Sequence, residues 1–264
     1  MSDRSGFLEA DGKRLEYRWF GGGPSPRAVV LLHHGLGCVG TWRDFPDRLA
    51  ALTGRPVFAY SRVGYGASDP VDLPRPWTYM HHEGEVVLPQ VLEAAGIEEA
   101  VLVGHSDGGS IAIVYAGLQG RGEGPPTTGA RVTGLVLIAA HVFNEPVSRA
   151  TIEDVGHRFR ETDLRKKLAK HHGNNVECAF WGWHDVWISP DFESWNLEEF
   201  MPSITLPVML LQGSDDNFGT LRQVDVIVRG IAGPVERVMI PDCGHSPHRE
   251  QPEVLLETIG RFLA

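Results

Sequence analysis

The chain has 264 residues, of which 42% are hydrophobic and 22% charged, the proportions of a soluble globular protein with a well-buried core. Its net charge of −10 and its lack of a basic run exclude nucleic acid and an anionic membrane surface as expected partners. Three widely spaced cysteines, no signal-peptide-like apolar stretch near the start and no run of roughly 18 apolar residues predict a cytoplasmic protein without a membrane span.

The first predicted element is a β-hairpin, because apolar and polar residues alternate on both sides of Asp11-Gly12. Short apolar runs follow along the chain, each bounded by turn residues and too short for a helix. Such runs are typical of strands in a parallel sheet that is buried on both faces. The runs are residues 28–34, 56–61, 100–106, 132–140, 207–213 and 234–240.

Segments with the spacing of amphipathic helices separate these runs, at residues 41–53, 81–96, 107–119, 220–232 and 250–263. Alternating strands and helices predict an α/β fold with a mostly parallel, doubly wound sheet. The stretch from 141 to 203 shows several helical pieces and no clear strand, and it is far longer than a usual connection. We therefore expect residues 141–203 to be an inserted helical cap on a core formed by residues 1–140 and 204–264. Residues 120–129 are expected to form a surface loop.

The pentapeptide Gly104-His105-Ser106-Asp107-Gly108 fits the G-x-S-x-G nucleophile elbow. In such an elbow the chain turns sharply between strand and helix, and the turn lifts the serine hydroxyl above the edge of the sheet. The pattern alone is weak evidence in a chain with 31 glycines, and a tight packing turn is the alternative. Its place between an apolar run and a helical segment favours Ser106 as a nucleophile.

A serine hydroxyl needs a base, because it is barely nucleophilic at neutral pH. His245 follows the last predicted strand, whereas His248, the nearest alternative, lies where the next helix should begin. A carboxylate is then needed to orient the imidazole, and Asp215 and Asp216 follow the preceding strand. Either aspartate is also a natural helix N-cap. The order serine, aspartate, histidine at the carboxyl ends of strands predicts a catalytic triad.

The tetrahedral intermediate of acyl transfer needs preorganised N–H donors. The backbone N–H of Asp107, directly after the serine, is one candidate. The glycine-rich loop after the first parallel strand is expected to supply the other, from Leu36. His33 and His34 precede Leu36, and we expect them to support this loop by packing and hydrogen bonding.

With these residues in place, the sequence resembles the α/β-hydrolase family over essentially its whole length. The segments that carry the resemblance are HHGLG, SRVGYGASD, GHSDGG, GSDD and GHSPH. The resemblance implies Ser106 as the nucleophile and His245 as the base. It also implies Asp216 as the acid, because the acid of the family usually stands three residues after a glycine, here Gly213. Residues 141–203 would then form the cap that shapes the substrate pocket.

Asp107 departs from the family pattern, since many relatives have a neutral residue after the nucleophile. Its side chain is expected either to attract a substrate ammonium, as in amino-acid ester hydrolases that look similar here, or to pair with His33, His34 or a backbone group. Aromatic side chains of the cap are expected both to pack and to line an apolar pocket. The candidate pocket residues are His34, Trp181, Trp183 and Trp187.

Two histidine pairs, His81-His82 and His171-His172, raise the question of a metal. Neither belongs to an H-E-x-x-H pattern or to a spaced ligand set, so no metal is expected. The glycines of HHGLGCVG lack the lysine of a phosphate loop, so no nucleotide cofactor is expected either.

These features predict a cofactor-independent serine hydrolase that cleaves a small apolar or aromatic ester or lactone through an acyl-enzyme. The nearest alternative is a carbon–carbon bond hydrolase of vinylogous diketones. That reaction requires a basic residue for the substrate carboxylate, for which Arg62 and Arg158 are candidates. An amino-acid ester hydrolase and a non-catalytic small-molecule receptor on the same fold are further alternatives.

Overall fold

The computed structural model describes residues 4–122 and 130–264, so most of the predicted loop at 120–129 lies outside the described residues. Eight strands within these residues form a sheet in the order β1-β2-β4-β3-β5-β6-β7-β8. Strands β1 (Ser5–Ala10) and β2 (Lys13–Phe20) form the predicted antiparallel hairpin. Its turn residues Asp11 and Gly12 have φ angles of 52° and 67°, the positive values that a tight hairpin turn requires.

The six apolar runs form strands that pair in parallel, as predicted, while β2 pairs with β4 in antiparallel fashion. Strand β8 differs from the expectation of burial on both faces, since most of its residues are at least partly exposed. Among the described strands it lies at the edge of the sheet and pairs with β7 alone. These strands are β3 (Arg27–Leu32), β4 (Val57–Tyr60), β5 (Glu99–His105), β6 (Arg131–Ile138), β7 (Val208–Gly213) and β8 (Val235–Ile240).

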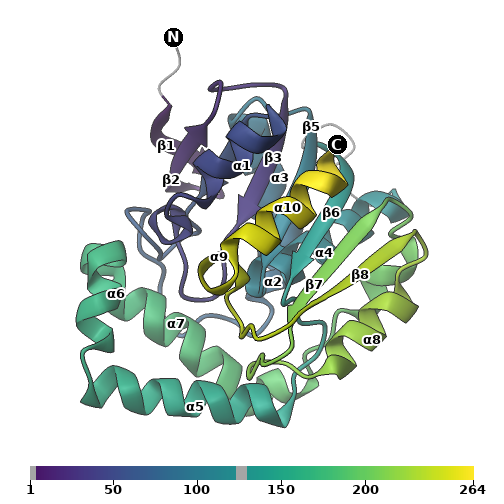
Figure 1. The fold of residues 1–264 in the computed structure, drawn as a ribbon. Helices are drawn as coiled ribbons and strands as arrows, with labels where there is room; N and C mark the ends of the chain where they lie inside the picture. Colours follow the sequence, from purple (N-terminus) through teal and green to yellow (C-terminus); the bar gives the residue numbers. More distant parts are fainter. Residues whose placement is uncertain (1–3, 123–129) are drawn as a thin grey trace.

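Helices cover both faces of the sheet (Figure 1). Helices α1 (Phe45–Thr53) and α10 (Pro252–Leu263) pack on one face and share one apolar core. Helices α3 (Leu88–Ala94), α4 (Asp107–Arg121) and α8 (Leu221–Gly230) contribute to a second core on the other face. The doubly wound α/β class is thereby confirmed.

The predicted helix 81–96 consists of three consecutive pieces. Helix α2 (Tyr79–His82) comes first, a π-helical turn (Glu83–Val87) follows, and α3 completes the segment. The short helix α9 (Pro247–Glu250) precedes α10. No helix within residues 4–122 and 130–264 combines the length and the apolar character that crossing a membrane requires.

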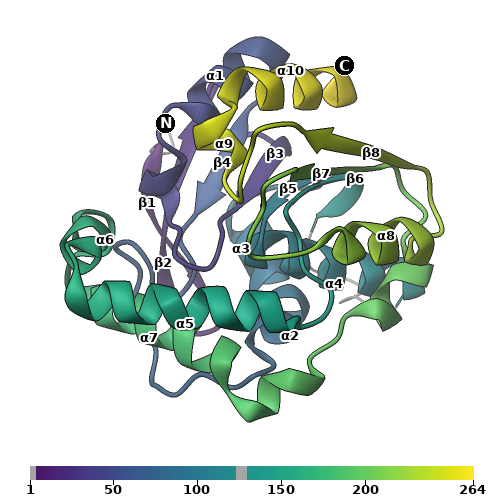
Figure 2. The same ribbon diagram turned by 60° about the horizontal axis from the view of Figure 1, so that its bottom comes forward.

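Three helices lie between β6 and β7, beyond the carboxyl ends of the strands (Figures 1 and 2). They are α5 (Pro146–Glu161), α6 (Leu164–His172) and α7 (Val176–Ile188). Helices α5 and α7 run side by side in Figure 2 and contact each other. The 3₁₀ segment Glu198–Ser203, which leads back towards β7, packs on α4 where Gly117 and Gly120 leave no room for a side chain.

Candidate active site

Ser106 lies between β5 and α4 with backbone angles φ 55° and ψ −120°, a conformation that residues other than glycine rarely adopt. The turn is so tight that flanking side chains have no space. A Cβ on Gly104 would approach the Gly108 carbonyl oxygen to 2.3 Å, and one on Gly108 would approach the Leu32 oxygen to 2.1 Å. The glycines of the pentapeptide are therefore required by close packing of strand, turn and helix.

His245 and Asp216 form a hydrogen-bonded pair at the carboxyl ends of β8 and β7. His245 Nδ1 lies 2.9 Å from Asp216 Oδ2 and 3.0 Å from Oδ1. The Asp216 side chain is 1% exposed and that of His245 13%. Burial opposes ionisation of Asp216, but His245 and the hydrogen bonds from His245 and Phe218 outweigh it and lower the pKa of the carboxyl. Because an ionised carboxylate only accepts, Nδ1 carries the proton and Nε2 is left as the basic nitrogen.

The alternatives to these two residues lie elsewhere. Asp215 is exposed and accepts a hydrogen bond from Ser214 Oγ at 3.1 Å. His248 is buried in α9, with its ring 5.2 Å from that of Trp42, and burial lowers its pKa to about 3. The structure thus pairs Asp216, rather than Asp215, with His245, rather than His248.

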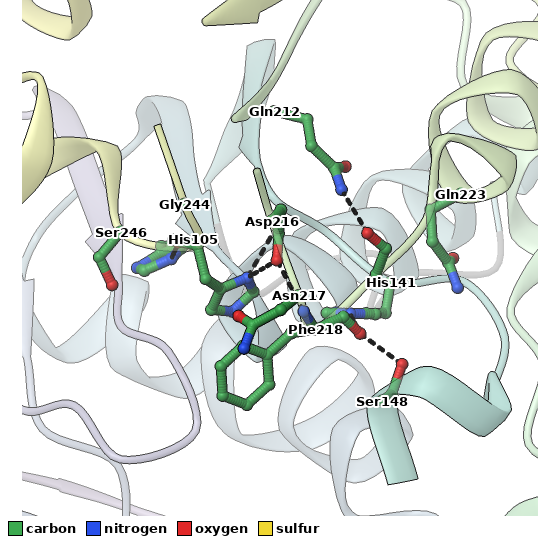
Figure 3. A network of polar contacts seen from close by, with 12 residues as sticks. His105, His141, Ser148, Gln212, Asp216, Asn217, Phe218, Gln223, Gly244 and Ser246 are labelled. Carbon is green, nitrogen blue, oxygen red and sulfur yellow. Dashed lines mark hydrogen bonds and ion pairs between the residues drawn. The ribbon is translucent and has the colours of Figure 1, made fainter. Parts of the chain in front are cut away.

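The loop that carries Asp216 is held by the start of α5. The Phe218 N–H donates to Asp216 Oδ1 at 2.8 Å. The Phe218 carbonyl accepts from His141 Nε2 at 3.0 Å and from the Ser148 hydroxyl, as Figure 3 shows. Thr151 Oγ1 adds a bond to the Asn217 carbonyl at 2.7 Å. The helical segment that follows β6 in the chain therefore orients the Asp216 carboxylate and also covers the carboxyl ends of the strands.

A cavity of ≈ 180 Å³ lies between the strand ends and the helices α5, α6 and α7. Ser106 and His245 share its wall with five other residues singled out from the sequence. These are His34, Leu36, Arg158 and two of the expected tryptophans, Trp183 and Trp187. The remaining wall residues are Gly35, His141, Ser148, Ile152, Val155, Leu164, Phe218 and Ser246.

The expectation for Trp181 is wrong, because this side chain does not line the cavity. Its Nε1 donates to Glu177 Oε2 at 2.8 Å, and the Arg160 guanidinium lies 4.7 Å from its ring. Helical geometry explains the difference. Trp183 and Trp187 are four residues apart and share one face of α7, whereas Trp181 is rotated from Trp183 by about 200°.

The two expected oxyanion donors lie on separate segments. Asp107 is the first residue of α4, so its N–H has no acceptor within the helix. The Leu36 N–H lies 3.3 Å from His34 Nδ1, a long hydrogen bond, and the Leu36 carbonyl accepts from His172 Nε2 at 3.1 Å. His33 supports the loop as expected, since its Nδ1 donates to the His34 carbonyl at 2.8 Å.

The Asp107 side chain does not line the cavity, so the first of its two expected alternatives, an ammonium site, is wrong. It also pairs with neither His33 nor His34. It accepts from the Tyr79 hydroxyl at 2.5 Å and lies 3.7 Å from the Arg62 guanidinium. Arg62 is equally buried and outside the cavity wall, so it is not available to a substrate carboxylate.

Sequence reasoning missed several wall residues. His141 follows β6 almost directly, and its place at the carboxyl end of a strand is a signal that would have found it. Ser148, Ile152 and Val155 follow the i, i+4, i+7 spacing of one helical face of α5. That spacing reveals a buried face but not which cavity the face lines.

No group of three or more histidine, cysteine, aspartate or glutamate side chains is arranged to hold a metal ion in the part of the chain that the structure describes. His172, from the second of the two histidine pairs, has a structural role instead. His172 joins two loops, since its Nδ1 accepts from the Gly66 N–H at 3.0 Å while Nε2 contacts the Leu36 carbonyl.

Acidification is expected to destabilise the fold through buried neutral histidines. Burial lowers the pKa of His172 to about 4 and of His248 to about 3, and it lowers those of His34 and His105 well below 6.5. In the unfolded chain these groups titrate near 6.5, so below that pH the unfolded state binds more protons. The stabilisation is fully present above about pH 6.5 and is lost as the pH falls towards 4.

Urea unfolding should give a free energy of unfolding at pH 5 that is lower than at pH 7.5 by about 1–2 kcal/mol for each of His172 and His248, and His34 and His105 should change it in the same direction. His172→Gln, which cannot titrate, should reduce the difference between the two pH values. Equal free energies of unfolding at both pH values would contradict the prediction.

Comparisons with known proteins identify the fold. The sequence matches the model of the "Alpha/beta hydrolase family" over residues 29–258. Monoglyceride lipase from Mus musculus is 24% identical over 273 residues, covering 94% of this chain and 84% of that protein. An esterase from Rhodococcus sp. ECU1013 has a similar structure, with a TM-score of 0.72, 21% identity and coverage of 99% and 98% of the two chains. The enol-lactonase from Burkholderia xenovorans LB400 has a TM-score of 0.70, 20% identity and coverage of 98% and 99%.

Proposed function

Because the chain belongs to the alpha/beta hydrolase family, we propose that it is a serine hydrolase with Ser106, His245 and Asp216 as its catalytic triad. As a member of this family the chain is a hydrolytic enzyme. The observation that carries the proposal is a shared cavity wall: Ser106 on its strained turn and the His245 ring, itself bonded to Asp216, line the same 180 Å³ space.

In the proposed reaction the Ser106 hydroxyl attacks a carbonyl carbon while His245 Nε2 accepts its proton. The N–H groups of Asp107 and Leu36 stabilise the resulting oxyanion. His245 then protonates the leaving group and activates water for hydrolysis of the acyl-enzyme. Asp216 holds the imidazole in the tautomer with the proton on Nδ1 and stabilises its charged form.

The size and lining of the cavity support a small apolar or aromatic ester or lactone as the substrate. A cavity of about 150 Å³ accommodates benzene, so 180 Å³ suits an acyl group near the size of one aromatic ring. The esterase and the enol-lactonase of the same fold support this substrate class. Since α5, α6 and α7 supply about half of the wall, we assign residues 141–203 the role of the substrate-shaping cap.

The experiment that tests this proposal is hydrolysis of p-nitrophenyl esters of graded acyl length, with and without an α-amino group. Short and aromatic acyl groups should be hydrolysed fastest, because longer chains exceed the cavity. An α-amino group should bring no advantage, since no acidic side chain lines the cavity among the described residues. Absence of turnover by the folded protein would instead favour carbon–carbon bond hydrolysis or a receptor role.

The presence of Arg158 in the cavity wall favours a second candidate function, hydrolysis of a substrate that carries a carboxylate. Carbon–carbon bond hydrolysis of vinylogous diketones requires such a basic residue for the substrate carboxylate. Among the described residues, Arg158 is the only member of the cavity wall with a permanent charge. Matched esters separate the two candidates: p-nitrophenyl butyrate is neutral, and the p-nitrophenyl half-ester of succinic acid has similar length and one carboxylate.

Arg158→Ala is expected to raise KM for the succinate half-ester by about 3- to 10-fold, the effect of one solvent-accessible charge-assisted contact. KM for the butyrate should change less than about twofold. Arg160→Ala is the matched control, because Arg160 lies over Trp181 outside the cavity. Equal effects of Arg158→Ala on both esters would remove the support for an anionic substrate.

A further inference from the structure

A charged pair is buried directly beneath the nucleophile turn. The side chains of Arg62 and Asp107 are each 1% exposed, and their nearest charged atoms lie 3.7 Å apart. Burying two charges is costly unless pairing and hydrogen bonds compensate the lost hydration. Neither side chain reaches the cavity, so substrate contact does not account for the pair.

Arg62 is attached to the loop that leads into Leu36. Its two terminal nitrogens donate to the carbonyl oxygens of His33 and His34, the latter at 3.2 Å. Its backbone N–H donates to His33 Nε2 at 3.0 Å. A planar guanidinium with several donors in fixed directions holds successive carbonyl groups in one orientation, which a lysine ammonium does not do.

Asp107 brings the other oxyanion donor into the same cluster, because its backbone N–H is the candidate donor and its side chain faces Arg62. The Tyr79 hydroxyl donates to Asp107 Oδ2 at 2.5 Å. Burial and the adjacent Asp107 carboxylate raise the pKa of Tyr79 well above 10, so the hydroxyl keeps its proton and remains a donor. One ion pair thus bridges the loop before Leu36 and the first residue of α4.

Trp187 links this cluster to the helices above the cavity. Its Nε1 donates to the Tyr79 hydroxyl at 3.2 Å, and its ring lines the cavity and packs edge-on against His141 with the ring centres 5.3 Å apart. Trp187 lies near the end of α7. The position of α7 is therefore connected, through Tyr79 and Asp107, to the turn that carries Ser106.

We propose that Arg62, Asp107 and Tyr79 are positioning residues, which fix the distance between the two N–H groups that bind the oxyanion. Trp187 links this distance to the position of α7 over the cavity. The inference rests on the proposed function, since the spacing matters only if both N–H groups bind the oxyanion. Such donors must lie about 2.7–3.1 Å from the developing charge, and these two belong to different segments, the loop after β3 and the start of α4.

Arg62→Lys tests the attachment of the loop, since it keeps the positive charge beside Asp107 and loses the paired carbonyl contacts. Arg75→Lys is its matched control. Both arginines are buried and lie over the Tyr65 ring, at 5.1 Å for Arg62 and 5.0 Å for Arg75. Arg75, however, donates to the Val63 carbonyl and not to the loop before Leu36, and its guanidinium lies over the face of the Tyr79 ring, 5.9 Å from the ring centre, rather than at the hydroxyl that bonds Asp107.

Tyr79→Phe tests the second connection, since it removes the donor to Asp107 and the acceptor of Trp187. Tyr115→Phe is its matched control. Tyr115 is a buried tyrosine of α4 whose hydroxyl donates to the Ala130 carbonyl at 2.8 Å, away from the cavity. Both variants lose one buried hydroxyl, but Tyr79→Phe also removes a donor to the buried Asp107 carboxylate and the acceptor of Trp187 Nε1, so its loss of stability should be the larger of the two.

On the best p-nitrophenyl ester, Arg62→Lys and Tyr79→Phe should each lower kcat by about 10- to 100-fold with KM within about twofold of the wild type, the signature of a contact made in the transition state. Affinity for an aryl trifluoromethyl ketone, which forms an oxyanion on the serine, should fall in parallel with kcat/KM. The double variant should lose less than the product of the single losses. Both controls should keep wild-type kcat.

Wild-type kcat in both test variants, a loss confined to KM, or equal losses in the controls would overturn the inference. Labelling of Ser106 in the wild type by a fluorophosphonate separates this failure from that of the proposed function. A labelled and active wild type whose test variants behave like the controls contradicts the inference alone. A folded wild type that is neither labelled nor active contradicts both.

Discussion

Replacing Ser106 by alanine is expected to lower kcat for ester hydrolysis by at least about 10⁴-fold. The substitution removes the attacking oxygen, and the remaining N–H donors and cavity supply only the residual catalysis that positioning and oxyanion binding allow. Alanine is the smallest change that keeps a Cβ on the turn, so the free energy of unfolding should change by less than about 1 kcal/mol. Steady-state kinetics on p-nitrophenyl esters and urea unfolding measure the two effects.

Ser68→Ala is the control for this substitution, because Ser68 is also buried but lies away from the cavity, with its hydroxyl donating to the Ser61 carbonyl at 2.7 Å. This variant should retain wild-type kcat. If Ser106→Ala kept a tenth or more of the wild-type rate, another group would have to be the nucleophile, and the proposed triad would be wrong.

Asp216→Asn is expected to lower kcat by about 10³- to 10⁴-fold. The amide keeps the size of the carboxylate but presents donors as well as an acceptor to His245 Nδ1. The imidazole then loses its preference for the tautomer with Nε2 free, and its charged form loses the neighbouring anion. The loss should appear in kcat rather than in KM, because Asp216 lies outside the cavity wall.

Asp215→Asn is the matched control, since it makes the same chemical change at the adjacent, exposed position. Its kcat should stay within about threefold of the wild type, as for a surface substitution. A larger loss for Asp215→Asn than for Asp216→Asn would reverse the assignment of the acid. Equal and small losses would show that no carboxylate assists His245.

Local patterns were sufficient to predict the strands and the nucleophile turn. A strand that is buried on both faces needs an apolar side chain at nearly every position. This need acts on each residue separately, so a run of apolar residues in the sequence predicts such a strand. The turn at Ser106 can be predicted for a similar reason. Gly104 and Gly108 each lie so close to a backbone oxygen that no side chain fits, and the two glycines therefore mark the turn in the sequence. The prediction of burial on both faces is wrong for β8, which is partly exposed. The order of strands in the sheet places β8 at the edge, and the sequence of a single strand does not contain this order.

The pairings within the candidate site were less predictable. The choice of Asp216 over Asp215 came from a resemblance, and the contact with His245 depends on the approach of two loops 29 residues apart. Trp181 and Trp183 are nearly equivalent in sequence, and only the rotation of α7 on α5 decides which of them faces the cavity.

The sequence by itself determined the α/β class and the position of the nucleophile turn, because backbone geometry and strand-end placement are imposed locally. It also supplied the three residues proposed for the triad, with the family resemblance deciding between Asp215 and Asp216. Only the tertiary structure decided the cavity wall and the partners of Asp107. The charge of Asp107 had several possible partners in the sequence, and its partner is Arg62, 45 residues earlier. Such a pair is stable only where packing has already removed water, and burial of that kind exists only once the strands, α4 and α7 have come together.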